Sequence, residues 1–171
     1  MKKNNMAKVT LGGNPSNTVA DLPSKGQKAP DFKLVKTDMS EVSLADYNGK
    51  NVILNIFPSV DTGVCATSVR EFNERAASLN NTVVLCISKD LPFAQARFCG
   101  AEGIENAIPV SNFRNESFGK DYGVELLDGG FKGLNARAVV VVNPQGEVIY
   151  TELVPEIGNE PDYEQALKAI S

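Results

Sequence analysis

The sequence predicts an α/β fold in which a mixed central sheet is flanked by helices. Apolar runs of strand length alternate along the chain with segments whose apolar residues follow helical spacing, which is typical of a sheet covered on both faces. The last two strand-like runs flank one tight turn, so part of the sheet is expected to be antiparallel. With 171 residues, 42% of them apolar and 22% charged, the chain is expected to form one domain over residues 1–171.

The N-terminal part predicts a β-hairpin over about residues 7–21. Short β-type runs at Lys8–Leu11 and Thr18–Ala20 flank Gly12-Gly13-Asn14-Pro15, which has the composition of a turn. Beyond the hairpin, two further short strands are expected, at Phe32–Val35 and Val42–Leu44.

The first strong strand is expected at Asn51–Phe57, which is mostly apolar without alternation and so indicates burial on both faces. Pro58 ends it, and Asp61 or Thr62 can cap the helix that follows. The apolar positions of that helix, at helical spacing, are Cys65, Val69, Phe72, Ala76 and Leu79.

The alternation continues to the end of the chain. Thr82–Ser88 predicts a second buried strand, and Pro92 begins a helix that runs towards Cys99 and stops at Gly100. The remaining expected elements are a strand at Ala107–Val110, a helix at Glu116–Tyr122, a strand pair at Ala138–Val142 and Val148–Leu153, and a last helix starting at Asn159-Glu160-Pro161. This order of elements is that of a thioredoxin-like fold.

Composition excludes several classes of function. The chain has 17 basic and 21 acidic residues, a net charge of −4, which argues against a nucleic-acid partner. Because it has no histidine, a Ser-His-Asp triad, a Cys-His dyad and imidazole metal ligands are excluded, and we expect neither a metal nor a cofactor. The longest apolar runs have five residues, against about 20 for a membrane span. With no export signal visible, a cytoplasmic location is expected.

Cys65 is the candidate reactive residue, because it lies in the first turn of a helix that follows a buried strand. Free N–H groups and the helix dipole at this position favour an anion and therefore a thiolate. Thr62, three residues earlier, either caps the helix or points at the sulfur. Ser68 stands where a Cys-x-x-Cys motif would have its second cysteine, so Cys65 cannot form that short local disulfide.

If Cys65 is oxidised to a disulfide within the chain, its partner is either Cys86 or Cys99. Cys99 is the better candidate because it ends a short helix, whereas Cys86 lies inside a strand and resembles an ordinary buried residue. Arg137, at the entry of an apolar strand, is either a surface residue or a cation that holds the thiolate. Arg70, farther along the helix of Cys65, is a weaker candidate for the same work.

These residues carry a resemblance to a known family. Pro58-x-x-x-Thr62-x-x-Cys65 resembles the active-site signature of peroxiredoxins. Four segments are similar to the bacterial thiol peroxidase family, the atypical two-cysteine peroxiredoxins: PSVDTGVCATSVREF, VVLCISKDLPFAQARFCGAEG, FRNESFGKDYGV and GLNARAVVVV. The resemblance runs from the N-terminal hairpin to the final EPDYEQALKA and covers nearly the whole chain.

The resemblance implies a role for each candidate. Cys65 corresponds to the peroxidatic cysteine and Cys99 to the resolving cysteine, while Cys86 is not required. Thr62 and Arg137 correspond to residues that hold the peroxide and activate the thiolate, and Pro58 to the residue that shields the pocket. It further implies reduction of hydrogen peroxide and alkyl hydroperoxides through a sulfenic acid and a Cys65–Cys99 disulfide, with thioredoxin as reductant and a homodimeric state.

Two other functions compete with this interpretation. One is a thiol–disulfide oxidoreductase that acts on proteins, against which the serine at position 68 argues. The other is a thioredoxin-like binding module with incidental cysteines, which the combination of Thr62, Cys65 and Cys99 makes improbable.

Overall fold

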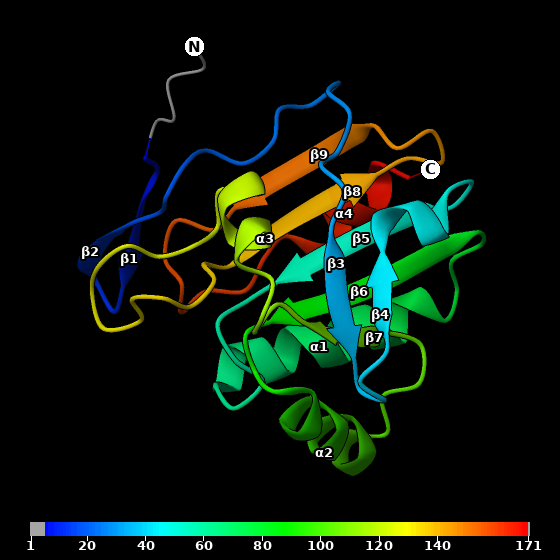
Figure 1. Cartoon of the computed structure of the whole chain (residues 1–171), viewed down its shortest axis with the longest axis horizontal. Coiled ribbons are helices and arrows are strands. Elements are labelled where there is room, and N and C mark those ends of the chain that lie inside the picture. The colour runs from blue at the N-terminus through cyan, green and yellow to red at the C-terminus, as the bar shows by residue number, and fades with distance from the viewer. Residues whose placement is uncertain (1–5, 171) are drawn as a thin grey trace.

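The structure, a computed structural model that describes residues 6–170, contains a seven-stranded mixed sheet and a separate N-terminal hairpin (Figure 1). The sheet strands are β3 (Lys33–Lys36), β4 (Glu41–Ser43), β5 (Asn51–Ile56), β6 (Thr82–Ser88), β7 (Ile108–Ser111), β8 (Ala138–Val142) and β9 (Val148–Leu153). They lie in the order β4-β3-β7-β6-β5-β8-β9, with β5, β6 and β7 parallel and the other neighbours antiparallel. The predicted mixed sheet is therefore confirmed.

Helices cover the sheet on both faces. They are α1 (Gly63–Ala76), α2 (Pro92–Glu102), α3 (Glu116–Asp121) and α4 (Tyr163–Lys168), with one 3-10 turn at Leu44–Tyr47. Side chains of α1, α2 and α4 pack on one face, around Phe72, and α3 packs on the other, around Phe118. In residues 6–170, every helix falls short of the length and apolar character that crossing a bilayer requires.

The two strands at the centre of the sheet, β5 and β6, send successive side chains to opposite faces. Leu54 and Leu85 join the core on the α3 side, and Ile53 and Val84 join the core under α1. Both faces are therefore buried, which explains why the segment that predicted β5 is mostly apolar and does not alternate. The carboxyl ends of β5 and β6 are thus fixed side by side.

The N-terminal hairpin consists of β1 (Lys8–Leu11) and β2 (Asn14–Asn17). The prediction that its second strand lies at Thr18–Ala20 was wrong. Gly12 and Gly13 alone form the turn, at φ of 58° and 83°, because two consecutive glycines provide the positive φ angles that a two-residue hairpin turn needs.

Helix α2 continues past Gly100, so the prediction that this glycine stops the helix was also wrong. The helix ends at Glu102 and is capped by Gly103, whose φ of 66° is the left-handed conformation that glycine adopts without strain. Cys99 therefore lies inside the helix, one turn from its end.

One carboxylate ties the hairpin to the segment after β9. Glu156 accepts hydrogen bonds from Gly13 N at 2.8 Å, Thr10 Oγ1 at 3.0 Å and Gly158 N at 2.7 Å. The backbone donors Gly158 and Gly13 lower the pKa of Glu156 from 4.5 to about 2. The same segment is fixed by a bond from Ile157 N to Thr10 O at 2.8 Å.

We predict that Glu156→Gln lowers the stability of the protein at neutral pH, because an amide cannot accept all three bonds. The carboxylate has a lower pKa in the folded than in the unfolded state, so its stabilisation is present above pH 4.5 and disappears as the pH falls towards about 2. The difference between variant and wild type in urea unfolding, followed by circular dichroism, should therefore shrink over that range. Glu74→Gln, at an exposed position, is the control. A difference that does not change with pH would contradict this role of Glu156.

Candidate active site

Cys65 lies in the first turn of α1, which a short loop connects to the carboxyl end of β5. Thr62 is the N-cap residue of this helix, with extended backbone angles. The Cys65 side chain is fully buried, and its sulfur lies 3.1 Å from Nη2 of Arg137. A cation and the start of a helix thus lie beside the same sulfur.

Arg137 immediately precedes β8 and is only 2% exposed. Its Nε donates to Ile157 O at 2.8 Å, and among residues 6–170 no partner contacts its Nη1. None of the ion pairs described in this range joins Arg137 to a carboxylate. A buried guanidinium requires a compensating partner, and the Cys65 sulfur is the side-chain group in contact with it. The alternative that Arg137 is a surface residue is therefore wrong.

Thr62 and Pro58 lie on the loop between β5 and α1. The Thr62 hydroxyl donates to Ser59 O at 3.0 Å and does not cap the helix with its side chain. Pro58 is buried at the end of the strand. Both residues thus lie in the short connection that leads into the helix of Cys65, within seven positions of that cysteine.

The other two cysteines lie in different surroundings, and all three are free thiols. Cys86 is fully buried in β6, and burial raises its pKa to about 12, although an Asn55 hydrogen bond acts in the other direction. Cys99 is half-buried in α2, and burial raises its pKa to about 11. Neither residue is therefore a ready nucleophile in this conformation.

Ser68 and Arg70 are held in structural contacts. Ser68 Oγ donates to Cys65 O at 2.8 Å and accepts from the Asn55 amide at 3.3 Å, inside the core. Arg70 pairs with Glu102 of α2 at 3.1 Å. Arg70 thus links α1 to α2, and among the described contacts the sulfur of Cys65 is held by Arg137 alone.

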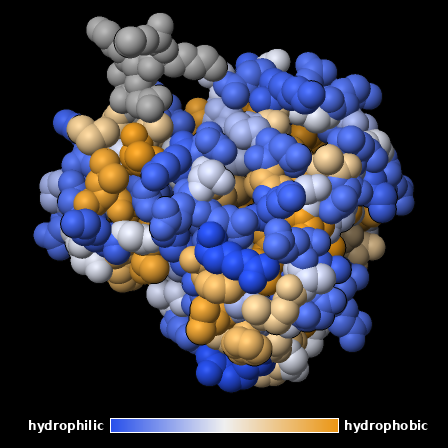
Figure 2. All heavy atoms as spheres, in the orientation of Figure 1, coloured by the Kyte–Doolittle hydropathy of each residue, from blue (hydrophilic) through white to orange (hydrophobic). Residues whose placement is uncertain are grey.

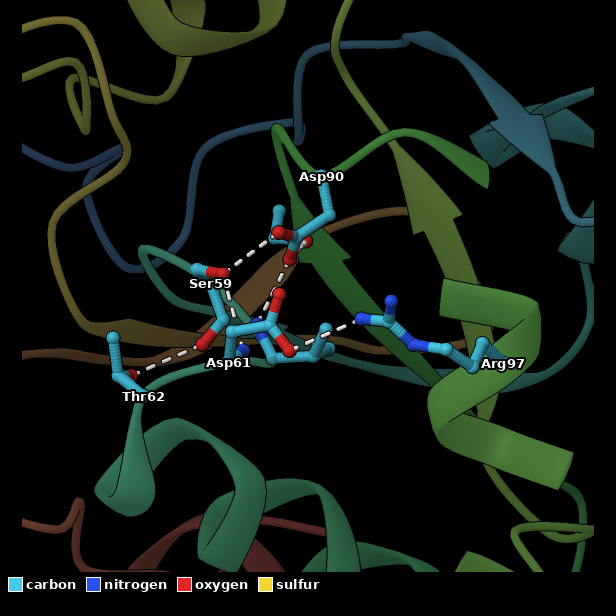
Figure 3. A network of polar contacts seen from close by, with 7 residues as sticks. Ser59, Asp61, Thr62, Asp90 and Arg97 are labelled. Atoms are coloured by element: carbon cyan, nitrogen blue, oxygen red, sulfur yellow. Dashed lines mark hydrogen bonds and ion pairs between the residues drawn. The ribbon is translucent and has the colours of Figure 1, made fainter. Parts of the chain in front are cut away.

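Three groups that position the site are absent from the residues predicted from the sequence. Ser59 and Asp90 are hydrogen-bonded to each other (Figure 3). Ser59 follows β5 and Asp90 follows β6, and since the carboxyl ends of parallel neighbours meet, this pairing had a signal in the sequence. The third group is the carbonyl of Ile157, which orients Arg137 and has no signal, because any residue provides a carbonyl.

Comparisons with known proteins show the family of the chain. Residues 24–167 match the Redoxin family. The thiol peroxidase of Mycobacterium tuberculosis is 61% identical over 96% of this chain and 99% of its own length. The thiol peroxidase of Corynebacterium glutamicum is 58% identical over 97% of this chain and its full length.

Solved structures show the same fold. A peroxiredoxin-like protein from Aquifex aeolicus superposes with a TM-score of 0.90 at 38% identity, over 96% of both chains. A thiol peroxidase from Chromobacterium violaceum has a TM-score of 0.87 at 23% identity, over 94% of this chain and 93% of its own, which supports the fold alone. The thioredoxin-like fold is thus confirmed, and the chain belongs to the Redoxin family, as a peroxiredoxin of the thiol peroxidase type.

Proposed function

We propose that this chain reduces hydrogen peroxide and alkyl hydroperoxides, with Cys65 as the attacking group. The observation that carries the proposal is the contact of 3.1 Å between the Cys65 sulfur and the buried Arg137 guanidinium. Nη1 of that guanidinium has no partner within the described residues, so a polar donor beside the sulfur is left for a bound oxygen. A buried donor without a partner is costly, and a peroxide oxygen relieves that cost.

In the first step, the Cys65 thiolate attacks the terminal oxygen of the hydroperoxide. An S–O bond forms, the O–O bond breaks, and the alkoxide or hydroxide that leaves takes up a proton to become an alcohol or water. Arg137 stabilises the negative charge that moves onto the leaving oxygen. The Thr62 hydroxyl, which donates to Ser59 O, accepts a hydrogen bond from the O–H group of the peroxide, and Pro58 excludes water. Cys65 becomes a sulfenic acid.

In the second step, the Cys99 sulfur attacks the sulfenic sulfur, forming a disulfide and releasing water. Burial raises the pKa of Cys99 to about 11, so few Cys99 side chains are thiolates while α2 is intact. Unwinding of α2 returns the thiol towards its ordinary pKa of about 8.5. The movement that brings the two sulfurs together therefore also makes Cys99 a better nucleophile.

The cycle ends with a protein partner that supplies two thiols, and we propose thioredoxin, which reduces the disulfide by exchange. Leu91 and Phe93, at the start of α2, are 52% and 67% exposed. Figure 2 shows hydrophobic surface at the lower end of the molecule, where α2 lies in Figure 1. Exposed apolar surface is typical of protein contacts, which supports the thiol-bearing partner and the homodimer as proposals. A reducing compartment such as the cytoplasm suits this cycle.

We predict that Cys65→Ser abolishes peroxide consumption, because a hydroxyl at this position is not ionised at neutral pH. Consumption of hydrogen peroxide and of an alkyl hydroperoxide, with thioredoxin and its reductase present, is the measurement. Cys86→Ser is the matched control: serine keeps an acceptor for the Asn55 amide, and turnover should stay near that of the wild type. Substantial turnover by Cys65→Ser would overturn the assignment of the nucleophile.

We also predict that Cys99→Ser reacts once with peroxide and is then not recycled. One equivalent of peroxide should leave Cys65 as a sulfenic acid, which dimedone traps, whereas the wild type should give a single disulfide. Mass spectrometry of peptides from the unreduced wild type identifies the bonded pair. A Cys65–Cys86 bond, or full recycling of Cys99→Ser by thioredoxin, would mean that Cys99 is not the resolving cysteine.

A further inference from the structure

Asp90 lies in the connection between β6 and α2, and both oxygens of its carboxylate accept hydrogen bonds. Oδ1 accepts from Ser59 Oγ at 2.7 Å, and Oδ2 accepts from Val60 N at 2.8 Å and from Ser88 Oγ at 2.6 Å. Figure 3 shows the carboxylate of Asp90 reaching the loop that carries Ser59. We call these four residues the Asp90 clamp. It joins the loop that precedes α1 to the loop that precedes α2.

On the Cys65 side, the clamp continues into the start of α1. Ser59 Oγ accepts from Asp61 N at 3.1 Å, and Ser59 O accepts from both the Thr62 hydroxyl at 3.0 Å and Thr62 N at 3.2 Å. Thr62 is the N-cap residue of the helix, and Cys65 follows in its first turn. The position of Ser59, and with it of this turn, thus depends on the Asp90 carboxylate.

On the Cys99 side, Asp90 is fixed to the sheet. Its carbonyl accepts a short hydrogen bond from the Ser111 hydroxyl at the end of β7. Buried Gln95, in the first half of α2, donates to Ser88 Oγ at 3.1 Å and to Val110 O at 2.9 Å. The clamp therefore has a rigid base, and Ser59 and Val60 are the part that can separate from it.

A second link between the two segments is much weaker. Arg97 of α2 pairs with Asp61 at 3.3 Å, but the two side chains are 68% and 66% exposed. Exposed ion pairs contribute little to stability, because water screens the two charges. This pair is a suitable control, because it also links the loop before α1 to the α2 segment but does so through an exposed contact.

The two chemical steps place opposite demands on this connection. Attack on peroxide needs the first turn of α1 in place, with Cys65 against Arg137. Disulfide formation needs the α-carbons of Cys65 and Cys99 within about 7 Å, while Cys65 starts fully buried and Cys99 lies inside a helix. A group that ties one segment to the other therefore supports the first step and retards the second.

We propose that Asp90 is a positioning residue that holds the loop of Cys65 in its peroxide-reactive arrangement and must release Ser59 and Val60 before Cys65 and Cys99 can join. The proposal rests on the function proposed above. It adds a residue that influences whether the sulfenic acid is oxidised further or forms the disulfide. While the clamp is closed, a second hydroperoxide can oxidise the sulfenic acid to a sulfinic acid. One more S–O bond forms, one O–O bond breaks, and the hydroperoxide leaves as an alcohol or water. When it opens, Cys99 forms the disulfide.

The test is Asp90→Asn, which keeps the shape of the side chain but replaces one acceptor oxygen with an NH₂ group. Ser59→Ala, which removes a single bond of the clamp, is the second variant if Asp90→Asn fails to fold, and Asp61→Asn is the control. Rapid-mixing measurements separate the rate of Cys65 oxidation from the rate of disulfide formation. Mass spectrometry gives the sulfinic fraction at high peroxide, and urea unfolding reports global stability.

We expect Asp90→Asn to slow the first step and to lower the sulfinic fraction by about tenfold, the factor that one lost hydrogen bond to a charged group represents. Ser59→Ala should shift both quantities in the same directions by less, and Asp61→Asn should stay within about twofold of the wild type. A sulfinic fraction equal to that of the wild type in folded Asp90→Asn or Ser59→Ala overturns the proposal, whatever the change in stability. If the wild type itself forms neither sulfenic acid nor the Cys65–Cys99 disulfide, the proposed function fails instead.

Discussion

The buried contact between the Arg137 guanidinium and the Cys65 sulfur is the interaction on which the reactive centre depends. In a chain without histidine, no imidazole can take the proton of a nucleophile. In the proposed mechanism a permanent cation takes its place: Arg137 is 2% exposed and has no carboxylate partner among the described residues. An isolated charge of either sign is costly inside a protein. The proposed Cys65 thiolate and the Arg137 guanidinium therefore stabilise each other in the buried state.

The rest of the fold positions Arg137 and Cys65 relative to each other. The loop after β5 leads into the start of α1, and β8 begins directly after Arg137. The orientation of the guanidinium comes from Ile157 O, in a segment that the N-terminal hairpin fixes through Thr10 and Glu156. The hairpin thus contributes to the site although it contains no reactive residue. Asp90 ties the loop that precedes α1 to the segment that follows the carboxyl end of β6.

Much of this arrangement was predictable, because it rests on local chemistry. Strands β6, β8 and β9 have the bounds that their apolar runs predict, and Cys65 lies in the predicted first turn. The errors arose where one glycine pattern allows two outcomes: the Gly12-Gly13 turn is shorter than expected, and Gly100 continues a helix. The burial of Arg137 and its carbonyl partner depend on packing between distant segments, which a single sequence does not reveal.

The most direct test of the central interaction is the ionisation of Cys65 when it is the only thiol of the chain. In a Cys86→Ser, Cys99→Ser background, the ultraviolet absorbance of the thiolate at neutral pH is compared with and without Arg137→Gln, with the fold checked by circular dichroism. The account predicts a thiolate signal in the presence of Arg137 and a decrease of about tenfold without it, in line with the loss of a charge-assisted contact. An equal thiolate signal in both folded proteins would contradict it.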